Sequence, residues 1–185
     1  MKILETALSL FRSRGFDKVT IDDICEATGI VKSTFYYHYK SKEQLIGDYV
    51  SIIDDISSEQ IALVLMENTF VKQIWALFEI YLDFADKLGP DLVKQFLISN
   101  LNDYKSAIAP RDLKHYEVYI NLIDKAQKIG QINNPTPAKE LAETCICLAD
   151  GIYILWAIES GQYSLLETCR QAINHLLLPA EGYKL

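Results

Sequence analysis

The 185-residue sequence lacks the short motifs that mark most enzyme active sites. It has no glycine-rich phosphate loop, no His-Glu-x-x-His zinc motif and no Gly-x-Ser-x-Gly nucleophile motif. Its three histidines, His38, His115 and His175, are scattered along the chain and suggest no catalytic group. We therefore expect neither an enzyme nor a protein with a bound cofactor.

Cysteine is also scarce, and its positions do not have the spacing of a zinc site. Cys145 and Cys147 are two residues apart on an expected helix, so they point to nearly opposite sides and cannot easily share one ion. Together with Cys25 and Cys169 they lie in apolar segments. We predict four reduced, buried thiols and no metal, with a thiol or metal sensor as the alternative.

Long hydrophobic runs are missing as well. No uninterrupted apolar run reaches the roughly 18 residues that span a bilayer, and the N-terminus has no long uncharged signal segment. Half of all residues are nevertheless apolar and 11% are aromatic, which is enough for a packed core. These features predict a cytoplasmic globular protein with no membrane partner.

Positive charge is in deficit overall, but the deficit is confined to one part of the chain. Residues 1–50 carry seven basic and seven acidic side chains, so the net charge of −7 arises entirely downstream. Residues 29–42 contain three lysines, one histidine and no carboxylate. This stretch could approach a polyanion, so the charge distribution favours a local contact with nucleic acid.

The first 30 residues predict two short helices. Apolar residues in positions 3–11 have the spacing of one helix face, and Gly15 followed by Phe16 is a typical helix end. Thr20, with Asp23 three residues later, predicts the cap of a second helix that ends near Gly29. The apolar face of the first helix consists of Ile3, Leu4, Ala7, Leu8 and Phe11.

A third helix follows so closely that it must cross the second at a steep angle. Its spacing directs Val31, Phe35 and Tyr39 inward. The outward and flanking positions carry short polar and aromatic groups, which suit base edges and phosphates in a DNA major groove. These candidate DNA-binding residues are Lys32, Ser33, Thr34, Tyr36, Tyr37 and His38.

Residues 41–44, Ser-Lys-Glu-Gln, predict a capping box that opens a fourth helix running to about residue 65. Lys42 lies beside the start of this helix, where its charge and the free amide groups favour a phosphate oxygen. Lys40 could assist it.

Downstream, glycine, proline and asparagine interrupt stretches of helical periodicity, and no strand-like alternation occurs. We therefore predict an all-α protein of about nine helices, with one domain at residues 1–45 and another at 46–185. The helices expected in the second domain span 70–88, 91–104, 111–129, 138–160 and 164–178.

The segment from Ile3 to Leu45 closely resembles the helix-turn-helix DNA-binding module of the TetR (tetracycline repressor) family. Its most specific part is Gly29-Ile30, then Lys32 to Tyr39 (KSTFYYHY), then Ser41-Lys42-Glu43. The resemblance implies that Thr34, Tyr36, His38 and Lys42 contact operator DNA and that Thr20 caps a helix near the DNA backbone. Val31 departs from the family, which often has a polar cap at that position.

The resemblance also implies a ligand pocket in the larger domain and a homodimer built by the last two helices, residues 138–178. Independent support comes from Leu141 to Ile158, where nearly every residue is apolar, as expected for a helix buried all round. A second apolar stripe, from Leu165 to Leu177, could complete a four-helix contact between subunits. The alternative is a core helix of a monomer.

Aromatic side chains are abundant in the larger domain and either line a cavity or fill the core. They suggest a small apolar or aromatic effector, and the candidate ligand-binding residues are Trp75, Phe78, Tyr81, Phe96, Tyr104, Tyr119 and Trp156. We assign Asp150, inside the apolar run, no role. The sequence thus predicts a transcriptional repressor released from its operator by an effector; the alternative is a DNA-binding architectural or interaction protein that needs none.

Overall fold

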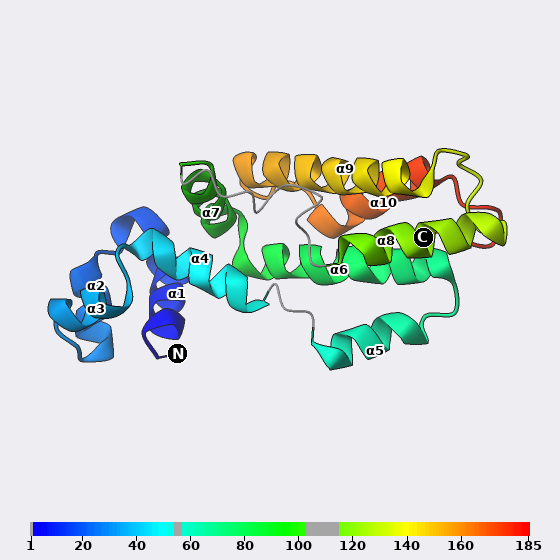
Figure 1. Cartoon of the computed structure of the whole chain (residues 1–185). Coiled ribbons are helices and arrows are strands. Elements are labelled where there is room, and N and C mark those ends of the chain that lie inside the picture. Colours follow the sequence, from blue (N-terminus) through cyan, green and yellow to red (C-terminus); the bar gives the residue numbers. More distant parts are fainter. Residues whose placement is uncertain (1, 54–56, 103–114) are drawn as a thin grey trace.

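A computed structural model describes residues 2–53, 57–102 and 115–185, and these ranges confirm the all-α fold. They form ten α-helices and one short 3-10 helix (Figure 1). The helices are α1 (Lys2–Arg14), α2 (Ile21–Thr28), α3 (Lys32–His38), α4 (Lys42–Ile53), α5 (Ser58–Met66), α6 (Phe70–Leu88), α7 (Pro90–Asn102), α8 (Tyr116–Lys128), α9 (Ala138–Ile158) and α10 (Leu165–Leu177), and the 3-10 helix η1 spans Phe16–Lys18.

The helices α1, α2 and α3 form a small N-terminal body at one end of the molecule (Figure 1). Its core consists of apolar side chains that are almost completely buried, including Leu8, Phe11, Ile24, Phe35 and Leu45. The chain turns after α1 at Gly15, whose φ of +85° disfavours other residues, and Phe16 then packs against Phe11 with ring centroids 4.9 Å apart. The helix end predicted at Gly15-Phe16 is therefore confirmed.

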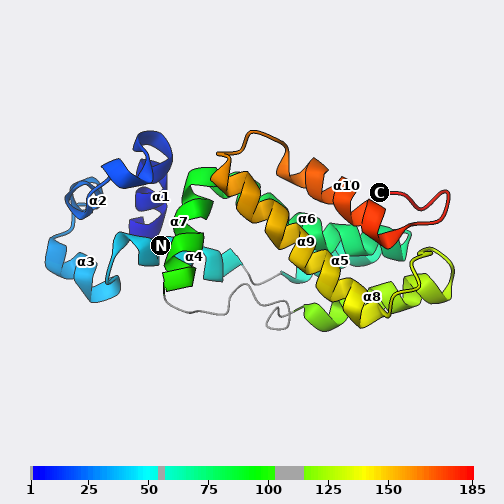
Figure 2. The same cartoon turned by 90° about the horizontal axis from the view of Figure 1, so that it is seen from above.

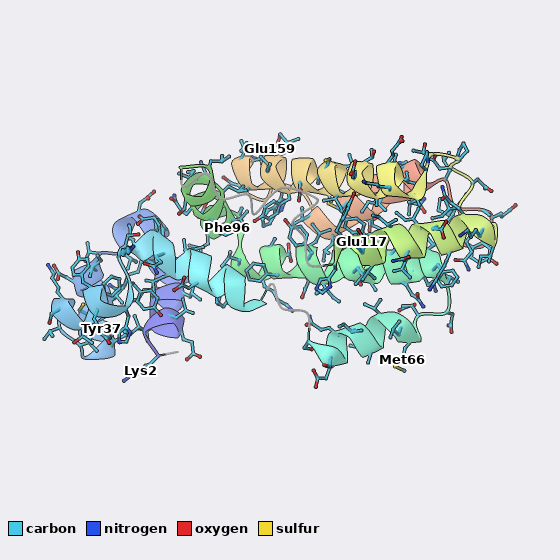
Figure 3. The ribbon with its side chains drawn as sticks, viewed as in Figure 1. Lys2, Tyr37, Met66, Phe96, Glu117 and Glu159 are labelled. Atoms are coloured by element: carbon cyan, nitrogen blue, oxygen red, sulfur yellow. The ribbon has the colours of Figure 1, made fainter. Side chains whose placement is uncertain are left out.

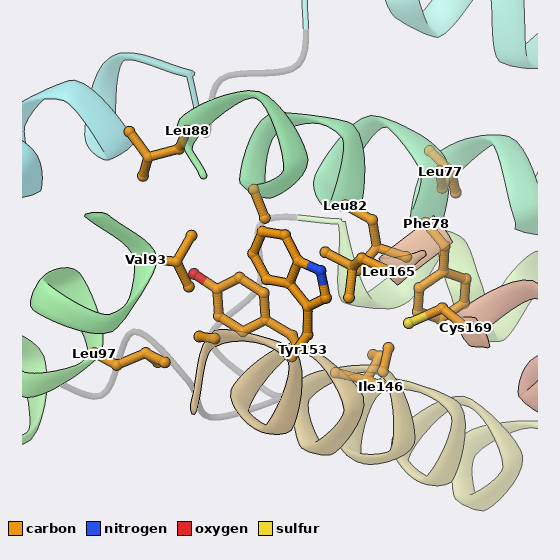
Figure 4. Close-up of a cluster of buried hydrophobic side chains, with 14 of the residues drawn as sticks. Leu77, Phe78, Leu82, Leu88, Val93, Leu97, Ile146, Tyr153, Leu165 and Cys169 are labelled. Carbon is orange, nitrogen blue, oxygen red and sulfur yellow. The ribbon is translucent and has the colours of Figure 1, made fainter. Parts of the chain in front are cut away.

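The larger body is a bundle in which α9 contacts α7, α8 and α10, while α6 contacts α8 and α10. Seen from above, α9 and α10 lie side by side, and α7 lies across the junction with α4 (Figure 2). Side chains from α6, α7, α9 and α10, among them Leu82, Val93, Ile146 and Leu165, fill the centre (Figure 4). The predicted helices of this region begin and end within a few residues of the observed ones, except that residues 103–114 lie outside the described part.

The prediction of one fourth helix from 42 to 65 is wrong, because α4 ends at Ile53 and α5 begins at Ser58. Ser57 caps α5: its side chain accepts a hydrogen bond from the Gln60 N–H at 3.2 Å, and the Ser57 N–H donates to Gln60 Oε1 at 2.9 Å. This Ser-x-x-Gln pattern is a signal for a new helix that the continuous apolar stripe concealed. The extra helix also explains why ten helices occur where about nine were expected.

Two predictions of buried side chains are also wrong. Val31 is 65% exposed, because it precedes α3 in extended conformation instead of lying on the helix face with Phe35. Cys147 is exposed, whereas Cys25, Cys145 and Cys169 are buried and have free thiols. Burial raises the pKa of Cys145 and of Cys169 to about 12, so both thiols are protonated and unreactive at neutral pH.

A single chain buries one side of α9 and leaves another exposed, so burial all round would require the partner subunit that the prediction assumes. Leu141, Cys145 and Trp156 are buried, whereas Leu155 and Ile158 are 54% and 59% exposed. Among the described helices, α9 has the length and composition of a membrane span, although half of its most apolar window is buried. The search of the sequence for uninterrupted apolar runs did not identify α9 as a possible membrane span. The central helix of a helical bundle has the same length and composition, so this feature is weak evidence for a membrane.

Asp150 is a half-buried charged residue of α9 that faces this bundle. Its Oδ1 accepts a hydrogen bond from the Tyr81 hydroxyl at 3.3 Å. Burial raises the pKa of Asp150 from 3.8 to about 6, while the hydrogen bond from Tyr81 lowers it. The carboxylate is therefore a destabilising charge at neutral pH.

We predict that Asp150→Asn stabilises the protein at pH 8 and has little effect at pH 4. Because the folded pKa lies above the unfolded value, protonated Asp150 contributes stability below about pH 4 that is lost as the pH rises through about 6. The gain at pH 8 should be about 1–2 kcal/mol, less than the full shift implies because the side chain is only partly buried. Urea denaturation at both pH values measures it, and an equal effect at pH 4 and pH 8 would contradict the assignment.

Candidate nucleic-acid interface

The interface begins with a well-capped α2. The Thr20 N–H donates to Asp23 Oδ2 at 2.7 Å, and the Asp23 N–H donates to Thr20 Oγ1 at 3.2 Å, which confirms the predicted capping box. Hydrogen bonds from the Thr20 side chain and backbone lower the pKa of Asp23, so the carboxylate stays ionised. Thr20 itself is exposed at this helix end, beside the surface that carries α3.

A turn of three residues, Gly29 to Val31, connects α2 to α3. Gly29 has φ +72°, in the left-handed region, and its N–H donates to the Glu26 carbonyl at 3.3 Å. The Ile30 N–H then donates to the Cys25 carbonyl at 3.0 Å. This helix end redirects the chain abruptly, so α3 crosses α2 and presents a separate face.

Phe35 holds α3 to the rest of the N-terminal body. Its side chain is completely buried, and the ring contacts Tyr36 and Tyr39 at centroid distances of 5.6 and 5.8 Å. The remaining α3 side chains face solvent, with Tyr36 54% and Tyr37 84% exposed. Figure 3 places Tyr37 at the end of the molecule farthest from the larger body. The exposed set is Lys32, Ser33, Thr34, Tyr36, Tyr37 and His38, so all six α3 candidates share one accessible surface.

Lys32 is paired with a neighbouring carboxylate. Its Nζ lies 2.9 Å from Asp22 Oδ1, and this hydrogen bond and ion pair raise the pKa of the ammonium. Both side chains are exposed, so the pair is weak and can exchange for another anion. Residues 29–42 contain no carboxylate, but the fold brings the carboxylate of Asp22, on α2, next to Lys32.

Lys42 is engaged inside the protein. Its Nζ donates to the carbonyls of Phe16 at 2.9 Å and Val19 at 3.2 Å, and it lies 4.2 Å from the centroid of the Phe16 ring. Two of its three donors are thereby used, so at most one is left for a phosphate. Sequence reasoning missed this contact because Phe16 and Lys42 are 26 residues apart.

The capping arrangement at the start of α4 differs slightly from the predicted one. The Gln44 N–H donates to Ser41 Oγ at 3.4 Å, as expected, but Gln44 Oε1 accepts from the Lys40 N–H at 2.7 Å rather than from Ser41. The helix still begins at Lys42, whose amide is therefore near the protruding surface.

The candidate ligand-binding aromatics do not all lie together. Phe78 and Tyr119 pack against each other with centroids 4.6 Å apart, and Tyr81 contacts Tyr153, which sequence reasoning did not select, at 6.1 Å. Trp75 is buried, Phe96 is half-buried on α7, and Tyr104 lies outside the described residues. The Trp156 indole donates to the Tyr163 carbonyl at 3.1 Å, so this ring joins α9 to the segment before α10.

A shallow depression of about 370 Å³ lies at the end of α8 and along residues 132–135. Asp124, Gln127 and Lys128 line one side of it, and none of the candidate aromatic residues borders it. It is open and polar, so it does not resemble a site for an apolar effector.

Residues 3–49 match the family described as "Bacterial regulatory proteins, tetR family". A curated relative, the biofilm operon icaADBC HTH-type negative transcriptional regulator IcaR of Staphylococcus aureus, is 31% identical over 96 residues, which cover 52% of this chain and 50% of that protein. The chain thus spans about half the length of the curated relatives that it matches most extensively. Both descriptions are of regulators rather than enzymes.

Solved structures extend the likeness to the whole fold. FadR of Thermus thermophilus, a TetR family transcriptional repressor in complex with lauroyl-CoA, has a TM-score of 0.60 and 19% identity and covers 95% of this chain and 92% of its own. AibR in complex with isovaleryl coenzyme A and operator DNA has a TM-score of 0.56 and 20% identity over 96% of this chain and 97% of its own. Residues 3–49 thus match the DNA-binding region of the TetR family, and the whole chain has the same fold as these solved regulators.

Proposed function

We propose that this protein is a transcriptional repressor that inserts α3 into the major groove of operator DNA. The observation that carries the proposal is the exposed α3 surface, which protrudes from the molecule while Phe35 alone is completely buried. The relative named a negative transcriptional regulator supports repression rather than activation. Such a protein acts in the cytoplasm.

The residues of α3 suit complementary contacts with a duplex. Ser33 and Thr34 lie on the first turn, where short side chains reach base edges, and the methyl of Thr34 can pack against a thymine methyl. Tyr36, Tyr37 and His38 can donate hydrogen bonds to phosphate oxygens, as can Lys32 after it leaves Asp22. Thr20 and the start of α4 flank the same surface.

A homodimer would place two such helices in successive major grooves, ~34 Å apart. We assign its interface to residues 138–178, because α9 leaves an apolar strip exposed that includes Cys147, Leu155 and Ile158. An exposed apolar strip on a long central helix is typical of an association surface. In α10, Leu166 and Leu176 are partly exposed and can extend the strip.

The helix α4 connects the proposed DNA-binding body to the larger body, with one contact near each end of the helix. Lys42 binds the segment before α2, whereas Tyr49 packs against Phe84 of α6 with centroids 5.6 Å apart. Leu45 and Ile46 of α4 are completely buried, so the domain boundary predicted between residues 45 and 46 falls within a packed helix. An effector that shifts α4 would alter the position of α3, with a coupling of typically ~1–3 kcal/mol.

We assign the effector to the region of α6, α8 and α9 and expect a small, largely apolar or aromatic molecule. The aromatic contacts support this, because Phe78 of α6 packs against Tyr119 of α8 and Tyr81 of α6 contacts Tyr153 of α9. FadR and AibR were solved with acyl-coenzyme A ligands, which contain an apolar chain. A DNA-binding architectural protein without an effector is the second candidate, and it would show the same DNA affinity whatever metabolite is added.

We predict that Tyr36→Ala weakens binding to DNA from the upstream region of its own gene by about tenfold, the effect of losing one good contact of 1–2 kcal/mol. Fluorescence anisotropy measures the affinity, and Tyr36→Phe separates the hydroxyl from the ring. The control is Ile129→Ala, because Ile129 is 60% exposed at the far end of α8. Equal affinity of Tyr36→Ala and the native protein would refute the assignment of α3.

We predict that Lys42→Ala lowers the free energy of unfolding by about 1–2 kcal/mol, because the Phe16 and Val19 carbonyls lose their donor. Chemical denaturation tests this, with Lys40→Ala, an exposed neighbour, as the control. If Lys42 also binds a phosphate, the slope of log affinity against log salt should fall by about one. An unchanged stability would contradict the internal contact, and an unchanged slope would restrict Lys42 to a structural role.

We predict that Leu155→Glu converts the protein from a dimer to a monomer, because a charge would have to be buried in the α9 surface. Light scattering coupled to size-exclusion chromatography measures the mass. Ile129→Glu, an equally exposed apolar residue outside residues 138–178, should remain a dimer. A native protein that is monomeric at micromolar concentration would rule out this interface.

A further inference from the structure

Asp150 is an ionisable group in the larger body that the proposed DNA contact does not use. Among the described residues, Tyr81 is its only hydrogen-bond partner, at 3.3 Å, and no lysine, arginine or histidine pairs with it. A carboxylate held in an apolar bundle without a counter-charge is costly, and proteins rarely keep one without a use. A bound cation would therefore stabilise the Asp150 carboxylate.

Three tyrosines from three helices, Tyr81 of α6, Tyr119 of α8 and Tyr153 of α9, lie in the same part of the bundle as this carboxylate. The Tyr81 hydroxyl donates to Asp150 at 3.3 Å, and burial, followed by the charge of Asp150, raises the pKa of Tyr81, Tyr119 and Tyr153. The Tyr81 and Tyr153 rings are 6.1 Å apart, and Phe78 packs on Tyr119 at 4.6 Å. Figure 4 shows the Tyr153 ring extending from α9 toward Val93 of α7.

Two of these hydroxyls have no hydrogen-bond partner among the residues that the structure describes. Within the described ranges, neither the Tyr119 nor the Tyr153 hydroxyl makes a hydrogen bond, although both residues are only 6% exposed. Neither oxygen is fully enclosed, because His115 Nε2 is the one completely buried polar side-chain atom without a partner in the described ranges, so both hydroxyls are accessible to a water or a bound molecule. The bundle thus combines a carboxylate without a counter-charge, two free hydroxyls and several aromatic faces.

We propose that Asp150, Tyr81, Tyr119 and Tyr153, here called the Asp150 cluster, bind the positively charged group of a small organic amine or quaternary ammonium compound. The carboxylate neutralises the charge, and the aromatic faces attract a cation through their quadrupoles. An attached apolar or aromatic portion of the ligand would pack against Phe78 and its neighbours. The role of this cation as an effector rests on the proposed function, but its binding does not.

Calorimetric titration of the full chain at pH 7.5 tests the proposal. The probes are benzylamine and benzyltrimethylammonium, which are cationic, and benzyl alcohol, which is a neutral analogue of similar shape. We expect both cations to bind and Asp150→Asn to weaken their binding at least tenfold, with benzyl alcohol bound weakly and equally by both proteins. Equal cation affinity in the variant, preference for the alcohol, or no binding of either cation at 10 mM, roughly the weakest affinity that such measurements detect, would overturn the proposal.

Two matched variants separate charge from structure. Glu159→Gln removes an exposed carboxylate just after α9, labelled in Figure 3, and should leave cation affinity unchanged. Tyr81→Phe keeps the ring and the Asp150 charge but removes their hydrogen bond, so cation affinity should fall by less than it does in Asp150→Asn. An effect of Glu159→Gln as large as that of Asp150→Asn would show that only long-range charge is involved.

A pH series on the native protein does not depend on the folding of any variant. Cation affinity should fall as the pH drops below about 6, because the Asp150 carboxyl becomes protonated. The tyrosines of the cluster and the nearby Cys145 and Cys169 stay neutral in this range, since burial raises the pKa of each. A constant affinity from pH 5 to pH 8 would overturn the proposal.

These measurements contain no DNA, so their failure differs from failure of the proposed function. If cations bind but no duplex is retained, the Asp150 cluster stands and the repressor assignment fails. If a duplex is retained but neither cation binds, the repressor assignment stands and the cluster fails. Addition of benzylamine to the DNA complex then shows whether the cation releases it.

Discussion

The protruding face of this protein depends on the burial of a single side chain, Phe35. A helix of seven residues such as α3 is too short to be stable alone in water, so packing must hold it in place. One completely buried ring does this while the rest of the helix stays in solvent. A short helix anchored at one point can protrude far enough to enter a groove, which a helix packed along its whole length cannot do.

The connection between this anchored helix and the larger body is equally local. Lys42 begins α4 and binds carbonyls of the segment before α2, and Tyr49, two turns later, meets Phe84 of α6. Because both contacts are on one helix, a movement of α6 would be passed directly to the N-terminal body that carries α3. Asp150 accepts a hydrogen bond from Tyr81. Tyr81 lies on α6 about one helical turn before Phe84, the residue that Tyr49 of α4 contacts.

Features that depend on neighbouring residues were predictable. The capping box of Thr20 and Asp23, the turn at Gly29 and the outward side chains of α3 follow from hydrogen bonds and periodicity within a few residues. The break between α4 and α5 was missed because apolar periodicity outweighed the Ser57–Gln60 capping signal. Val31 was misplaced since a helix wheel was extended one residue beyond the true start of α3.

The sequence by itself determined the helical class, the outward position of the α3 side chains and the likeness of residues 3–49 to the TetR family, because these rest on local patterns of apolar, polar and capping residues. Only the tertiary structure decided that Lys42 binds the Phe16 carbonyl, that Asp22 pairs with Lys32, and that Asp150 of α9 accepts a hydrogen bond from Tyr81 of α6. Such contacts join residues from different helices. They depend on how helices cross, which packing of the whole chain sets and no local pattern encodes.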